Sequence, residues 1–146
     1  MKLNGVVTVN APQEEVWQLF MDPVQLGRVI PGCEQVQQLD ETHYEAVLSV
    51  KVQFMTIRSK ARGTLLEAEA PHHLVGELMG EPIAMAGAFR ARLTIDLAPA
   101  GNATDVRYVM DLTMLGRLAS LGEAIIRSTS QQLTKQFVEN VSELFS

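Results

Sequence analysis

The sequence predicts an α+β fold in which a curved antiparallel sheet wraps around a long C-terminal helix, with two short helices after the first strand. Apolar and polar residues alternate through most of 33–114, which is the period of half-buried strands. After Gly116 the apolar residues recur with a helical period up to the C-terminus. The 146 residues match the size of a single domain, 1–146.

The N-terminal third predicts a strand followed by two helices. Residues 2–10 alternate as a strand, and Asn10 is the expected cap of a helix that has Pro12 in its first turn. Asp22-Pro23 breaks this helix before a second short one at 24–30.

Six further strands are predicted between the helices and the C-terminal helix, at 33–39, 43–54, 55–69, 73–80, 83–97 and 104–114. The C-terminal helix is expected to span about thirty residues, or about 45 Å at the α-helical rise. A helix of that length must cross the whole molecule, so we expect it to lie along the sheet.

Charge and cysteine content exclude several classes of protein. The 17 acidic and 12 basic residues give a net charge of −5, which argues against a nucleic-acid partner. Cys33 is the single cysteine, so an intramolecular disulfide or a cysteine-based metal cage is excluded. Neither a signal segment nor an apolar run long enough to span a membrane is evident. We therefore expect a cytoplasmic protein.

The predicted inward face of the sheet is apolar and contains small residues. Glycines and alanines such as Gly63 and Ala91 indicate either sharp bends of the sheet or a cavity beneath the helix. The polar residues on this face are Tyr44, Tyr108 and Ser59, with no acid or base among them. Since the histidines fall in turns or at strand ends without a ligand spacing, we predict no catalytic residue and no metal site.

The predicted outward face gathers positive charge from neighbouring strands, at Arg58, Lys60, Arg62, Arg90, Arg92 and Arg107. One interpretation is a solvated face with cross-strand ion pairs to Glu45, Glu67, Glu77, Asp96 and Asp105, which we favour. The other is a docking surface for an acidic partner.

Three segments resemble the CoxG family, the carbon monoxide dehydrogenase accessory proteins of the START/Bet v-like (SRPBCC) helix-grip superfamily. They are NAPQEEVW at 10–17, IPGC at 30–33 and GRLASLG at 116–122. The resemblance covers essentially the whole chain. It implies a helix-grip fold with a hydrophobic cavity, and an accessory role for a molybdenum-dependent carbon monoxide dehydrogenase or related hydroxylase. Peripheral membrane contact stays open, although the chain stops at Ser146 without the membrane-reaching tail of some members.

We expect a non-enzymatic protein that holds an apolar ligand, a quinone or another isoprenoid lipid, and no other cofactor. Tyr44 or Tyr108 would orient a ligand carbonyl. The expected lining residues are Leu48, Phe54, Met85, Phe89, Tyr108, Met110, Leu118 and Ile125. One alternative is a polyketide cyclase or dehydratase-like enzyme, which needs an inward acid or base. Another is an assembly or recruitment factor that acts through its surface without a ligand.

Overall fold

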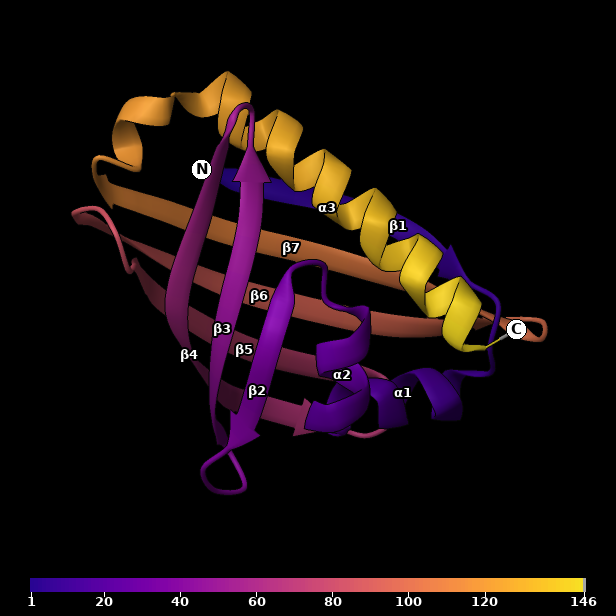
Figure 1. Cartoon of the computed structure of the whole chain (residues 1–146). Helices are drawn as coiled ribbons and strands as arrows, with labels where there is room; N and C mark the ends of the chain where they lie inside the picture. Colours follow the sequence, from indigo (N-terminus) through magenta and orange to yellow (C-terminus); the bar gives the residue numbers. More distant parts are fainter. Residues whose placement is uncertain (146) are drawn as a thin grey trace.

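The described residues, 1–145 of the computed structural model, form a seven-stranded antiparallel sheet, two short helices and a long C-terminal helix (Figure 1). The predicted α+β fold class is confirmed. The strand order is β1-β7-β6-β5-β4-β3-β2, so β1 and β2 are the edges of the sheet. In chain order the elements are β1 (Lys2–Val9), α1 (Gln13–Met21), α2 (Pro23–Val29), β2 (Cys33–Gln38), β3 (His43–Val52), β4 (Met55–Glu69), β5 (His73–Pro82), β6 (Gly87–Ala100), β7 (Ala103–Gly116), the single 3₁₀ turn η1 (Ala119–Leu121) and α3 (Glu123–Leu144).

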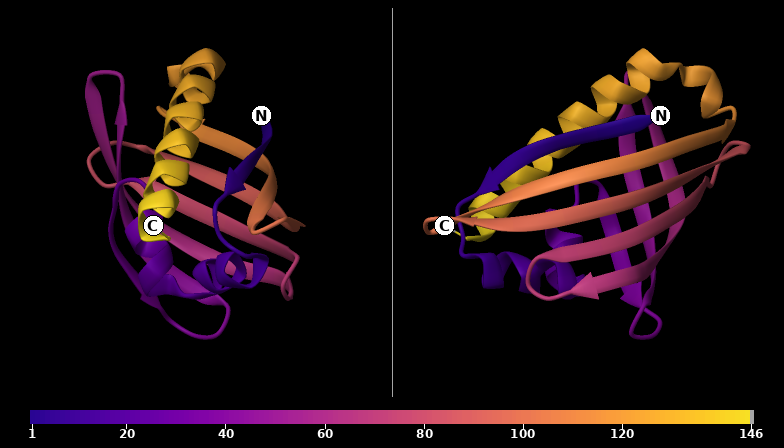
Figure 2. Two further views of the ribbon diagram at one scale, coloured as in Figure 1. Left: turned by 90° about the vertical axis from the view of Figure 1, so that its right-hand side faces the viewer. Right: turned by 180° about the vertical axis from the view of Figure 1, so that it is seen from behind.

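The sheet curves around α3, which runs diagonally across it (Figures 1 and 2). The strand register places alternate residues on one face, and we call the face turned toward α3 the inner face. It includes Leu78, Ala91 and Leu112, which pack with Ile126 of α3. The helices α1 and α2 lie at the end of the sheet near the C-terminal end of α3 (Figure 1).

The two short helices are separated by a capping residue that the sequence indicates. The Asp22 carboxylate accepts hydrogen bonds from the backbone N–H groups of Val24 and Gln25, at 3.0 and 3.3 Å, and Pro23 occupies the first turn of α2. Asn10 is not the cap of α1, because Pro12 precedes the first helical residue and no side chain caps this end. The predicted cap was thus two residues too early.

The C-terminal helix is shorter than predicted. Gly122 has a φ of +87°, which no α-helix accommodates, so Leu118 and Leu121 belong to a separate turn before α3. The helix itself has 22 residues, about 33 Å of axial length. It begins at Glu123, six residues after the apolar period changes from that of a strand.

Two strand boundaries also differ from the predictions. The strand predicted at 43–54 ends at Val52, and Gln53 adopts a positive φ of 55° in the hairpin turn. The strand predicted at 83–97 begins only at Gly87, because 83–86 form the connection from β5 to β6. Both errors extend an alternating pattern through a turn whose residues happen to stay in phase.

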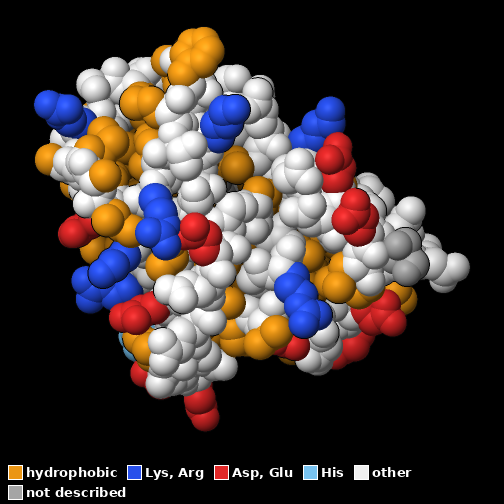
Figure 3. Space-filling view, in the orientation of Figure 1, with side chains coloured by type: hydrophobic (Ala, Val, Ile, Leu, Met, Phe, Trp, Pro, Cys, Tyr) orange, Lys and Arg blue, Asp and Glu red, His pale blue; other side chains and the backbone are white. Residues whose placement is uncertain are grey.

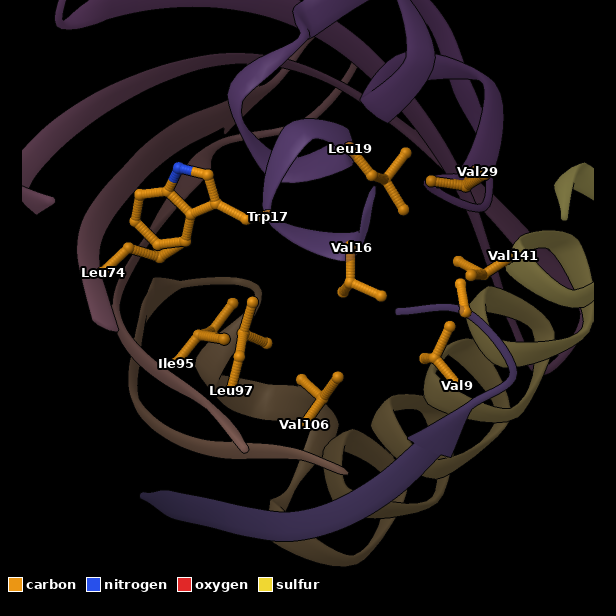
Figure 4. Packing of buried hydrophobic residues seen from close by; sticks show 11 residues of the cluster. Val9, Val16, Trp17, Leu19, Val29, Leu74, Ile95, Leu97, Val106 and Val141 are labelled. Carbon is orange, nitrogen blue, oxygen red and sulfur yellow. The ribbon is translucent and has the colours of Figure 1, made fainter. Parts of the chain in front are cut away.

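The buried apolar residues form two separate clusters. The larger one joins α1 and α2 to the β6 and β7 strands and to Val141 of α3 (Figure 4). Trp17 and Leu19 enter it from α1, toward Leu74, Ile95 and Val29. The smaller cluster lies at the other end of the inner face, around Leu3, Ala91, Leu112 and Ile126. Burial at the ends of α3 therefore holds the helix against the sheet.

Candidate functional site

The inner face of β3 and β4 is the part of the sheet that the two clusters leave uncovered. Its residues there are Ala46, Leu48, Val50, Ser59 and Ala61, and none of these described residues belongs to either cluster. The side of α3 facing this half of the sheet is less apolar than its ends, with Thr129, Ser130 and Leu133 half-buried. The site is therefore a shallow apolar floor beneath a partly polar helix.

Two clefts open on this side of α3. The larger, of about 610 Å³, lies between α2, the 30–33 turn, β2 and the C-terminal half of α3. The smaller, of about 480 Å³, lies between the end of β3 and the N-terminal half of α3, where Ile125 and Thr129 line it. Charged and hydrophobic side chains are interspersed on the surface around them (Figure 3).

The 30–33 turn has a local reason for its glycine. Gly32 has a φ of +78°, and a Cβ atom there would overlap the Ser49 carbonyl oxygen. The Ser49 N–H also donates to the Gly32 carbonyl, at 2.7 Å, which ties the turn to β3. Ile30, Pro31, Gly32 and Cys33 all line the larger cleft. This location is the one implied by the resemblance, at one end of the space between sheet and helix.

Polar residues of α3 that were not among the predicted site residues complete the larger cleft. Asn140 donates to the Val29 carbonyl at 3.0 Å and accepts from Gln136 at 2.9 Å. The signal in the sequence is a pair of amides four residues apart on the inner side of an otherwise amphipathic helix. Their hydrogen bonds join α3 to the end of α2.

Aromatic rings cover two inner-face glycines. Phe89 is the cross-strand partner of Gly80, and its ring lies where a Cβ atom of Gly80 would be. Tyr108 covers Gly5 in the same way, with its hydroxyl 2.7 Å from the position of a Cβ atom. These glycines therefore admit a ring from the neighbouring strand, and the space they leave is filled.

The predicted lining residues do not gather at one site. Leu48 lies on the inner face of β3, half-buried, and Ile125 lines the smaller cleft. Met110 packs in the smaller cluster, Tyr108 borders the larger one, and Leu118 is buried near Gly87. Of the eight residues, Ile125 is the one that lines either described cleft.

Phe54 and Met85 lie outside the strands in which they were predicted. Phe54 is 102% exposed at the turn between β3 and β4, so the prediction that it lines an internal cavity was wrong. Figure 3 shows hydrophobic side chains standing out at the top of the view, where this hairpin turns. Met85 is half-buried in the connection between β5 and β6.

The buried polar side chains among residues 1–145 are Ser59 and Thr104, neither of them an acid or a base. The Thr104 hydroxyl donates to the Ala11 carbonyl at 2.8 Å. The Tyr44 hydroxyl donates to the Glu41 carbonyl in the adjoining turn at 3.4 Å, so it points away from the floor. Tyr108 covers the β1 edge, on the opposite side of the sheet from β3.

Cys33 is a weak nucleophile in this setting. Burial raises the pKa of its thiol, and the hydrogen bond to the Gln35 carbonyl, at 3.5 Å, opposes this only in part. The thiol therefore stays protonated at neutral pH. No group of metal-binding side chains is present within the described range 1–145.

The outer face does not have the predicted cross-strand ion pairs. Arg58 pairs with Glu34, at 2.6 Å, while Glu67 and Asp96 contact His73 and Asp105 accepts from Thr8. In the described part of the chain, Lys60, Arg62, Arg90, Arg92 and Arg107 form no ion pair. Our preference for a face of internally paired charges was wrong.

A model of CoxG, a family of carbon monoxide dehydrogenase proteins, matches residues 5–146. The chain belongs to the CoxG family. The match spans nearly the whole chain and includes all three segments that carry the resemblance. In this CoxG-family chain the IPGC segment is the wall of the larger cleft.

Solved structures agree with the fold of this CoxG-family member. A conserved protein from Geobacillus kaustophilus has a TM-score of 0.90 at 24% identity, over 98% of this chain and 93% of its own. A START superfamily protein from Mycobacterium smegmatis has a TM-score of 0.75 at 9% identity, over 97% and 94%. A comparison with curated proteins gives no match. None of the described helices is both long and apolar enough to cross a bilayer.

Proposed function

We propose that residues 1–146 act as one domain, a non-enzymatic accessory protein of a molybdenum-dependent carbon monoxide dehydrogenase-like enzyme in the cytoplasm. Membership of the CoxG family, whose name refers to carbon monoxide dehydrogenase, supports the partner. The proposed ligand is a hydrophobic molecule, a quinone or another isoprenoid lipid, held between the sheet and α3.

The uncovered inner face of β3 and β4 is the observation that carries the ligand proposal. Ala46, Leu48 and Val50 remain only half-buried there, while the ends of α3 are fixed by the two clusters. A ligand that covers this floor removes apolar area from water, which is worth about 25 cal/mol per Å² before ordering costs. The clefts on this side of α3 supply entrances at both of its ends.

Native mass spectrometry of freshly purified protein, followed by denaturing extraction, tests this function. We expect an adduct of a few hundred daltons, on the order of the size of a cleft-bound ligand, that is released as an apolar compound. Protein stripped of it should bind an added prenylated quinone. A ligand-free mass together with no uptake of the added quinone would contradict the proposal.

A surface-acting assembly factor is the second candidate, and the unpaired cations of the outer face favour it. Arg62, Met79 and Arg90 are direct neighbours on β4, β5 and β6, and all three are exposed. Arginine and methionine are enriched at protein interfaces. This row fits an acidic partner surface with an apolar centre.

The double substitution Arg90→Glu and Arg92→Glu tests this candidate. Arg90 and Arg92 are exposed and form no ion pair within residues 1–145, so the free energy of unfolding should change by about 0.5 kcal/mol or less. Binding to the partner enzyme, measured by surface plasmon resonance, should weaken at least tenfold and depend less on salt. Lys135→Glu on α3 is the matched exposed control. Unchanged binding by the double variant would exclude the outer face as the docking surface.

A further inference from the structure

The Ser59 hydroxyl has no hydrogen-bond partner in the protein. Ser59 lies on the inner face of β4 and is 5% exposed. None of the hydrogen bonds within residues 1–145 involves its side chain. No side-chain oxygen in this range is both sealed from its surroundings and unpaired. The Ser59 oxygen therefore still borders space that a water-sized molecule reaches.

The neighbours of Ser59 leave this hydroxyl alone in an apolar setting. Leu48 of β3 and Pro82 of β5 are its direct cross-strand neighbours. Neither side chain accepts or donates a hydrogen bond. An unpaired hydroxyl in such a place is costly, because it loses water without gaining a partner. A group that enters the space above β4 would supply the missing hydrogen bond.

The same row of the sheet connects Ser59 to the larger cleft. Cys33, which lines that cleft, is paired with Leu48, and Leu48 is paired with Ser59. Two strand spacings separate the backbones of Cys33 and Ser59, or about 10 Å. A ligand that enters beside the 30–33 turn and extends across β3 would thus reach Ser59.

The surroundings also define the charge of the ligand. The inner face near Ser59 offers no ionised group, since the buried polar side chains of residues 1–145 are Ser59 and Thr104. A carboxylate or phosphate would lose its hydration there without a counter-charge. A carbonyl or hydroxyl would lose little and gain one hydrogen bond from Ser59, which both donates and accepts.

We propose that Ser59 is the polar anchor of the ligand site, and that the ligand is an apolar molecule with an uncharged oxygen-bearing head, a ketone, quinone or alcohol. This inference rests on the proposed ligand-binding function. Fatty acids and phospholipids are then poor ligands, because their heads are ionised. The hydrogen bond from Ser59 orients the head over β4.

Isothermal titration calorimetry with three probes of one hydrocarbon skeleton tests the proposal: a prenylated naphthoquinone, the matching naphthalene and the matching naphthoate. We expect the wild type to bind the naphthoquinone about fivefold more tightly than the naphthalene, and the naphthoate most weakly. Ser59→Ala should weaken naphthoquinone binding about fivefold and leave naphthalene binding unchanged. Thr129→Val, which removes a hydroxyl from the smaller cleft, is the matched control and should keep the preference.

A second variant separates position from composition. Ser59→Ala combined with Ala61→Ser restores a hydroxyl to the same face, two residues along β4, and should not restore the preference for the naphthoquinone. Unliganded Ser59→Ala should unfold at the wild-type temperature or above it, because the hydroxyl lacks a protein partner. A lower unfolding temperature would mean that Ser59 is structural and would overturn the proposal.

The remaining outcomes distinguish this inference from the proposed function. If the three probes bind but Ser59→Ala leaves the preference unchanged, the anchor is wrong and the ligand-binding function stands. Tightest binding of the naphthoate would overturn the uncharged head alone. If none of the probes binds, the proposed ligand-binding function fails and the inference fails with it.

Discussion

Two cross-strand pairs in the sheet place an aromatic ring over a glycine. Phe89 covers Gly80 between β5 and β6, and Tyr108 covers Gly5 between β1 and β7. The ring gains apolar contact with the exposed backbone of its partner, and the glycine gives it room to lie along the sheet. At these positions a small residue and a large one form a single packing unit.

Gly80→Ala should therefore destabilise the protein by about 1–3 kcal/mol, since the new methyl group would displace the Phe89 ring. Urea unfolding monitored by circular dichroism measures this change. Gly76→Ala on the same strand is the matched control, because its Cβ atom would be no closer than 3.6 Å to a neighbour, at Thr64. Phe89→Leu should relieve most of the clash in the double variant. An equal loss in both glycine variants would show that the ring is not responsible.

The residue-scale predictions that succeeded depended on the strand period. Alternation placed Ser59, Ala61 and Ala91 on one face, and all three are buried there. It did not indicate that Phe89 and Tyr108 would lie over glycines, because that depends on which residues face each other across strands. The lining residues of a cavity were therefore harder to predict than the face that carries them.

At the scale of elements, the sequence predicted the order of strands and helices and missed where some of them end. Alternation continues from β3 through Gln53 and Phe54, although the chain turns there. The helical period likewise begins at Leu118, although Gly122 interrupts the helix. A turn inside a regular pattern is visible only in the backbone conformation, at a positive φ in both cases.

The elements around the candidate site were less predictable than the sheet as a whole. The larger cleft requires α2, β2 and α3 to meet, and these elements are distant along the chain. The Asn140 contact with Val29 spans 111 residues. Such a contact has no local signature, whereas the IPGC segment on the same cleft was recognisable because its glycine is required by the turn.

For the whole molecule, the free energy of unfolding should depend on the protonation of His73, which joins three strands. Its Nδ1 atom is 2.7 Å from the Asp96 carboxylate on β6, and its Nε2 atom is 3.2 Å from Glu67 on β4. Glu69 adds negative charge nearby, while Arg107 faces Asp96 from β7. The hydrogen bonds to Asp96 and then Glu67 raise the pKa of His73 above its ordinary value of 6.5.

The sign of the effect follows from the raised pKa. Because the folded protein binds the His73 proton more tightly than the unfolded chain, the stabilisation is fully present below the unfolded pKa of about 6.5. It is lost as the pH rises through the folded pKa. Urea unfolding from about pH 5 to about pH 9 should show this loss in the wild type and not in His73→Gln.

His72→Gln is the control, because His72 makes a single contact with Glu69 at 3.6 Å, whereas His73 lies between two carboxylates. This variant should keep the decline in stability that the wild type shows toward alkaline pH. If His73→Gln followed the same pH curve as the wild type, the contacts that join β4, β5 and β6 through His73 would contribute nothing to global stability. The sheet would then be held by its ladders and its two clusters alone.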